Sequence, residues 1–136
     1  MIFQEMTLFN CIKKHKLLTA VYLLIFIASV MPIPDIKPLH DFNLLDKWVH
    51  FVMYGTLSLC AWWDRYHKRK SGLFTNIDFI HTTLFPTLFG GLMELVQRYC
   101  TFGIRSGDWI DVLANAIGVA LGFIIGFFFV RKICTK

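Results

Sequence analysis

The chain carries two sets of polar residues whose types could bind or transform a ligand. The first set consists of Asp46, Lys47, His50 and Tyr54. Because its members are separated by three or four residues, they fall on one face of a helix. A carboxylate, an amine and an imidazole on one face could hold a charged headgroup or exchange protons with it. In a plainer explanation, Asp46 and Lys47 anchor a helix at a membrane surface and His50 pairs with Asp46.

The second set lies between residues 94 and 115. It consists of Glu94, Gln97, Arg98, Arg105, Asp108, Asp111 and Asn115. Separations of three and four residues place its last three members on one helical face. Two acids at this spacing could hold a divalent cation through oxygen ligands, although a lone DxxD pair is a weak signal. A salt bridge from Glu94 to Arg98, and hydrogen bonding of Asn115 between helices, are the structural alternatives.

The elements that position these residues belong to a membrane protein. Of the 136 residues, 56% are hydrophobic, which is too many for an ordinary soluble domain. The net charge of +5 comes from short basic clusters between apolar runs, so it indicates membrane topology and no nucleic-acid partner. The four cysteines form no CxxC pair, so we expect neither a zinc site nor a disulfide framework.

The apolar runs predict an all-α membrane protein with four transmembrane helices in one domain, residues 1–136. The predicted spans are residues 17–34, 46–63, 77–97 and 108–130. The first has 18 residues without a charge, about 27 Å of helix, which is close to the thickness of the hydrocarbon layer. Pro86 lies near the middle of the third span, where we expect it to bend the helix.

The basic residues beside the spans orient the chain. Ten Lys and Arg residues lie in the N-terminal segment, the middle loop and the C-terminal tail, against four on the other side. The positive-inside rule therefore predicts that both termini are cytoplasmic. Both polar sets then lie at the outer side. Ionisable groups near the centre of a membrane helix cost at least ~2.5 kcal/mol and normally face a partner or a water-filled cavity, so we predict one shared pocket.

A stripe of glycines continues the polar face of the fourth span. Gly118, Gly122 and Gly126 follow Asn115 at four-residue spacing. Glycines at this spacing allow a partner helix to pack closely, which would hold the polar half of the face in register. Such a stripe suits a homodimer, and packing within one chain explains it equally well.

In chain order, the polar residues resemble the VanZ-like family of small membrane proteins. The resemblance lies in Asp46-Lys47-x-x-His50-Phe51-x-x-Tyr54, Glu94-x-x-Gln97 and Arg105-Ser106-Gly107-Asp108-Trp109-x-Asp111-x-x-x-Asn115-x-x-Gly118-x-x-x-Gly122. One departure is Met93, where many members carry an acidic residue. The family is named for a protein that confers resistance to teicoplanin, so the resemblance implies a role in the cell envelope and a multi-pass protein of the bacterial cytoplasmic membrane.

The leading hypothesis is that an outer-facing pocket binds the headgroup of a lipid or lipid-linked envelope precursor, with a contribution to teicoplanin resistance. Arg105, with Lys47 and Arg98, would hold an anionic phosphate or carboxylate. The other predicted ligand-binding residues are Asp46, Tyr54, Gln97, Asp108, Asp111 and Asn115. No cofactor is expected unless a divalent cation binds.

Two alternatives belong to other classes. In a membrane hydrolase or transferase acting on a phosphate-containing lipid, His50 and Glu94 would be the acid–base pair, and Asp108 and Asp111 would hold the cation. In a structural or assembly factor without a ligand, the polar groups would only lock the helices together. The sequence leaves open whether turnover occurs.

Overall fold

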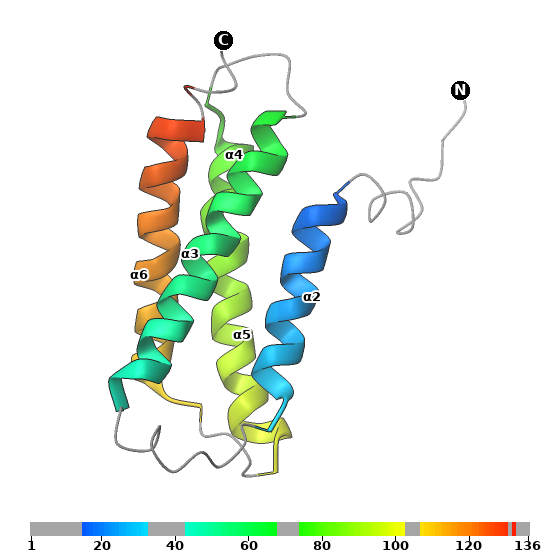
Figure 1. Cartoon of the computed structure of the whole chain (residues 1–136), viewed down its shortest axis with the longest axis vertical. Helices are drawn as coiled ribbons and strands as arrows, with labels where there is room; N and C mark the ends of the chain where they lie inside the picture. Colours follow the sequence, from blue (N-terminus) through cyan, green and yellow to red (C-terminus); the bar gives the residue numbers. More distant parts are fainter. Residues whose placement is uncertain (1–14, 33–42, 68–73, 103–106, 131, 133–136) are drawn as a thin grey trace, which may run out of the picture.

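The computed structural model describes residues 15–32, 43–67, 74–102, 107–130 and 132, and all regular structure in these residues is helical. Four helical rods run alternately up and down (Figure 1). They are α2 (Lys16–Val30); α3 (Asn43–His67); α4 (Asn76–Phe79) with a π-helical turn (Ile80–Leu84) and α5 (Phe85–Cys100); and α6 (Trp109–Ile125) with a π-helical turn (Gly126–Val130). The predicted all-α fold is confirmed for this part of the chain.

Two of the rods are long and apolar enough to cross a membrane. They are Asn76–Cys100 and Trp109–Phe129, with mean hydropathies of 1.3 and 2.3. Large apolar side chains point outward from both, among them Leu88, Ile117 and Ile124, each more than half exposed. Such outward apolar surface is expected of helices that face lipid. Four spans, and the side on which each terminus lies, stay predictions.

The first rod is shorter than predicted. α2 ends at Val30, and Met31 is extended with ψ of 138°. Pro32 explains this end, because a proline ring disfavours helical geometry in the residue before it. Fifteen residues make about 22 Å of helix, less than the predicted span 17–34 would provide. The end of that predicted span, residues 33 and 34, lies outside the described residues.

Pro86 is accommodated by a contact between helices. A proline has no N–H to donate to the carbonyl four residues earlier, which here belongs to Thr82. The Ser58 hydroxyl of α3 donates to this carbonyl at 2.7 Å. The local disturbance of the rod is the π-helical turn that ends just before α5, where Pro86 occupies the first turn.

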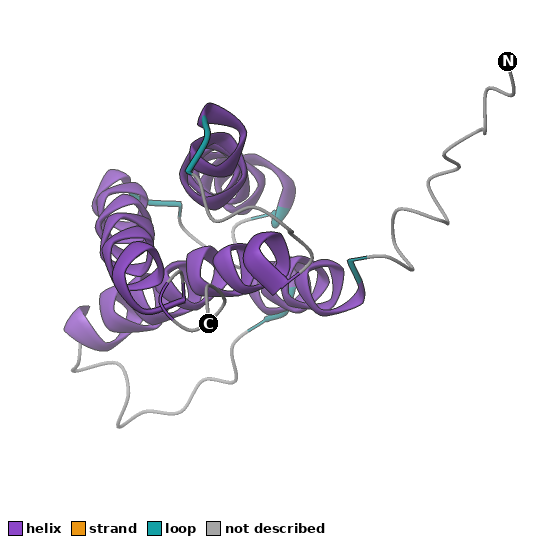
Figure 2. Cartoon of the chain, turned by 90° about the horizontal axis from the view of Figure 1, so that it is seen from above, coloured by secondary structure: helices purple, strands orange, loops and turns teal. Residues whose placement is uncertain are grey.

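The glycine stripe of α6 packs against α3. A Cβ added to Gly118 would collide with the Phe51 carbonyl oxygen, and one added to Gly122 would collide with the Gly55 carbonyl oxygen. In return, a Cβ on Gly55 would lie 3.2 Å from the Gly118 carbonyl oxygen. The partner helix that the glycine stripe was predicted to approach is thus α3 of the same chain. Figure 2 views the packed helices from above.

Charged residues form contacts between the helices at the end of the bundle opposite to the start of α6. Arg65 of α3 donates from Nε and Nη2 to Oδ1 of the fully buried Asp78, at 3.0 and 2.9 Å. The Thr75 backbone N–H and hydroxyl donate to the other Asp78 oxygen, so this carboxylate caps α4. His15 also contacts Asp64. These contacts set the position of α2 and α4 relative to α3.

Candidate polar network and adjoining cavity

The two predicted polar sets meet where α3 and α6 begin and α5 approaches its end. Four residues from three helices are almost completely buried there: His50 (5% exposed), Glu94 (4%), Asp111 (1%) and Asn115 (1%). The reason is helical periodicity, since each helix turns its polar face to the same point. The structure therefore brings together residues that are distant in the sequence. His50 and Asn115, for example, are 65 positions apart.

The buried centre is a three-residue network. Asn115 donates from Nδ2 to Glu94 Oε1 at 3.2 Å, while its Oδ1 lies 3.1 Å from His50 Nδ1. His50 Nδ1 is also 3.3 Å from Glu94 Oε1. The second carboxylate oxygen, Glu94 Oε2, is buried and has no hydrogen-bond partner among the described residues. Because an unpaired buried acceptor is costly, this oxygen is available to a donor that enters the site.

A second group of contacts surrounds Lys47. Its ammonium lies 2.6 Å from Asp111 Oδ1 and 3.5 Å from Asp108 Oδ2. Asp108 is also the N-cap of α6, and its side chain accepts from the Ile110 backbone N–H. This hydrogen bond, and the nearby Lys47, lower the pKa of Asp108. The Lys47 ammonium therefore lies where the sequence predicted a divalent cation between Asp108 and Asp111.

Asp46 and Tyr54 flank the network on α3. Asp46 Oδ1 is 3.9 Å from His50 Nε2, and its side chain is 46% exposed. Tyr54 is fully buried, and its hydroxyl has no hydrogen-bond partner within the described part of the chain. Its ring packs against Phe89 of α5, at a centroid distance of 6.4 Å. Tyr54 thus belongs to the core next to the network.

The remaining predicted residues have separate surroundings. Gln97 donates from Nε2 to the Ser29 carbonyl at 3.1 Å, so it ties α5 to α2. Arg98 lines the cavity described below, beside Asp108. Arg105 lies outside the described residues. Met93, at which the sequence departs from the VanZ-like pattern, is buried in the core.

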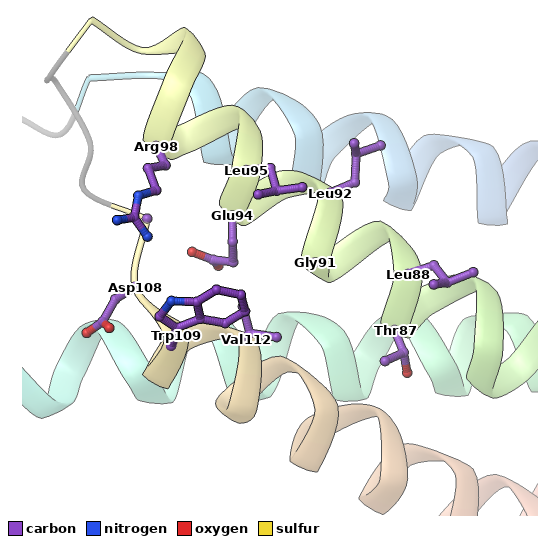
Figure 3. A pocket seen from close by; sticks show the side chains of 11 residues that line it. Thr87, Leu88, Gly91, Leu92, Glu94, Leu95, Arg98, Asp108, Trp109 and Val112 are labelled. Atoms are coloured by element: carbon purple, nitrogen blue, oxygen red, sulfur yellow. The ribbon is translucent and has the colours of Figure 1, made fainter.

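A cavity of about 370 Å³ lies between α5 and α6 and adjoins the network. Figure 3 shows Glu94 and Arg98 reaching from α5 towards α6, with Trp109 and Val112 opposite. The cavity is lined by Thr87, Leu88, Gly91, Leu92, Glu94, Leu95, Arg98, Gly107, Asp108, Trp109 and Val112. The cavity is thus apolar along most of its length and charged at one end.

Two glycines shape this cavity in different ways. A Cβ on Gly107 would collide with the Glu94 carbonyl oxygen and lie 3.0 Å from Arg98 Cβ, so only glycine fits at this position. A Cβ on Gly91 would meet nothing within 4 Å. Gly91 therefore leaves open space that packing does not require. Residue spacing in the sequence did not indicate this open space or the apolar walls around it.

The comparison with protein families matches the VanZ/LLP1 model to residues 2–130, nearly the whole chain. The chain belongs to the VanZ/LLP1 family. The resemblance to the VanZ-like family is thereby confirmed. Comparisons of this VanZ/LLP1 chain with curated proteins and with solved structures find no match.

Proposed function

We propose that this VanZ/LLP1 protein binds a membrane amphiphile, a lipid or a lipid-linked envelope precursor, in the cavity between α5 and α6. The observation that carries the proposal is the division of the cavity lining. Leu88, Leu92 and Leu95 form an apolar wall, and Glu94 and Arg98 stand at the charged end. A ligand with an apolar chain and a polar headgroup matches this division.

The headgroup chemistry follows from the two charged residues. Arg98 can donate to a phosphate or carboxylate through its guanidinium fork. Glu94 Oε2, buried and unpaired among the described residues, can accept from a hydroxyl or an ammonium. A headgroup with an anion and a hydrogen-bond donor, such as a sugar phosphate or phosphoethanolamine, satisfies both. The predicted topology would place this headgroup at the outer surface, where a change in envelope precursors could alter teicoplanin susceptibility.

The test is to identify and quantify, by native mass spectrometry, the lipid that co-purifies with the protein in mild detergent. Gly91→Leu fills the open space, so a lipid bound there would be overpacked. Overpacking costs about 1–3 kcal/mol, and we therefore expect roughly 5- to 150-fold weaker binding. Glu94→Gln and Arg98→Ala should reduce binding of the same lipid. Ile124→Phe, an exposed position outside the cavity lining, is the control and should bind like the wild type.

Two results would refute amphiphile binding. One is a wild-type protein that carries no specific lipid when bacterial lipid extract is added. The other is an unchanged lipid content in Gly91→Leu. If Glu94→Gln and Arg98→Ala lose thermal stability instead of lipid, the polar network is structural, as in the assembly-factor alternative.

A second candidate is a lipid-phosphate hydrolase or transferase. The observation in its favour is the His50–Glu94 contact of 3.3 Å, which is within reach of a proton transfer. Turnover of a lipid phosphate that is abolished in both His50→Gln and Glu94→Gln would support it. Purified wild-type protein without turnover would leave amphiphile binding as the function.

A further inference from the structure

Three possible metal ligands converge beside the Lys47 ion pairs. One ligand atom from each of Asp46, His50 and Asp111 lies within 4.8 Å of the other two. His50 and Asp111 are buried, whereas the Asp46 side chain is 46% exposed. The group is thus open to solvent on one side and enclosed on the others, so an ion could enter it from water.

The hydrogen bonds of His50 fix which ring nitrogen points at this group. The Asn115 amide donates its Nδ2 to Glu94, so its Oδ1 is the atom that faces His50 Nδ1. Both neighbours of Nδ1 are therefore acceptors, and Nδ1 carries the proton. In the neutral imidazole, Nε2 then has a free electron pair. Nε2 faces Asp46 Oδ1 at 3.9 Å, which is longer than a hydrogen bond.

This arrangement has the parts of a metal site. A metal-bound histidine usually donates its other ring N–H to a carboxylate or carbonyl, which orients the ring. Here Glu94 and Asn115 accept from Nδ1, Nε2 faces Asp46, and Asp111 belongs to the same group of possible ligands. The described charged residues of this region also carry an excess of negative charge. They comprise four acids, Asp46, Glu94, Asp108 and Asp111, and two basic residues, Lys47 and Arg98.

We propose that Asp46, His50 and Asp111 bind one divalent cation of the zinc or manganese class. One imidazole with two carboxylates suits these ions better than Mg²⁺ or Ca²⁺, which prefer oxygen ligands throughout. Glu94 and Asn115 orient His50 and do not contact the ion. The site differs from the predicted Asp108–Asp111 pair, and it does not depend on an amphiphile in the adjoining cavity.

Lys47 gives the proposal an unusual test. Its ammonium lies 2.6 Å from Asp111 Oδ1, so it competes with a cation for this carboxylate. Replacing Lys47 by Met removes the competitor and one positive charge. The ion should therefore bind more tightly to Lys47→Met than to the wild type. A purely structural Lys47–Asp111 pair predicts lower stability and no gain of metal.

The experiment is a titration of purified, tag-free protein in detergent with Co²⁺, followed by visible absorption, with Zn²⁺ and Mn²⁺ as competitors. We expect one equivalent to bind to the wild type, loss of binding in Asp46→Asn and His50→Gln, and tighter binding in Lys47→Met. Glu94→Gln should weaken binding roughly 10- to 100-fold, as loss of an orienting carboxylate does. His67→Ala, distant in the fold, is the control and should bind like the wild type.

Asp46→Asn is the decisive variant, because its half-exposed side chain can lose a charge with little risk to the fold. Stoichiometric binding that persists in Asp46→Asn would overturn the proposal. Absence of binding to the wild type would overturn it too. Failure of Gly91→Leu to affect lipid would refute the amphiphile and leave the cation site standing.

Discussion

Gly90 and Gly91 are adjacent in α5, yet the structure predicts opposite effects when each is replaced by alanine. Alanine in place of a helical glycine normally stabilises by about 0.5–1 kcal/mol, because the unfolded chain has less backbone freedom to lose. At Gly91 this gain should appear in full, since an added Cβ meets nothing within 4 Å. We expect Gly91→Ala to be more stable than the wild type.

At Gly90 the added Cβ would meet two neighbours. It would lie 3.0 Å from Tyr54 Cε1 and 3.2 Å from Asn115 Cβ. Overpacking of this kind costs about 1–3 kcal/mol, which offsets or exceeds the backbone gain. Both neighbours are buried, and Asn115 is held by Glu94 and His50, so neither can give way cheaply. We expect Gly90→Ala to be neutral or destabilised by up to about 2 kcal/mol.

The assay is thermal unfolding in detergent, followed by tryptophan fluorescence. One kcal/mol corresponds to roughly 2–8 °C in the midpoint for chains of this size range, so the two variants should differ by several degrees. Equal midpoints for Gly90→Ala and Gly91→Ala would refute the placement of the α5 face between the network and the cavity. The reverse order would mean that α5 is rotated about its axis relative to the structure.

Two further predictions concern the contacts between rods. Ser58→Ala should lower the free energy of unfolding by about 1–2 kcal/mol, because it removes the hydroxyl that donates to the Thr82 carbonyl. The control is Thr87→Ala, which removes a hydroxyl from the rod that contains Thr82 and should lower the free energy of unfolding by less in the same assay. Arg65→Met should cost about 3 kcal/mol, because it leaves the buried Asp78 without its ion-pair partner. The double variant with Asp78→Asn should recover part of this loss, and an additive loss would contradict the pairing.

The sequence by itself determined the helices and their faces. Apolar runs, proline positions and charge clusters predicted four helical segments close to the observed ones, because these features act over a few neighbouring residues. The two polar sets and the glycine stripe of α6 were also visible, since a spacing of three or four residues defines a helical face whatever packs against it. The end of α2 was wrong, because Pro32 stops this helix at Val30, and α3 extends beyond the predicted span 46–63 at both ends.

The tertiary structure decided what these faces touch. It placed the Lys47 ammonium against Asp108 and Asp111, turned Gln97 towards α2, and enclosed an apolar cavity beside Glu94. These outcomes depend on how far each helix is rotated about its axis and on which rotamer each side chain adopts. The spacing of residues in the sequence fixes neither the rotation of a helix nor a side-chain rotamer, because it does not determine which residues of two different helices face each other. Rotation and rotamers are set jointly by close packing, here the contact of Gly118 and Gly122 with the α3 backbone.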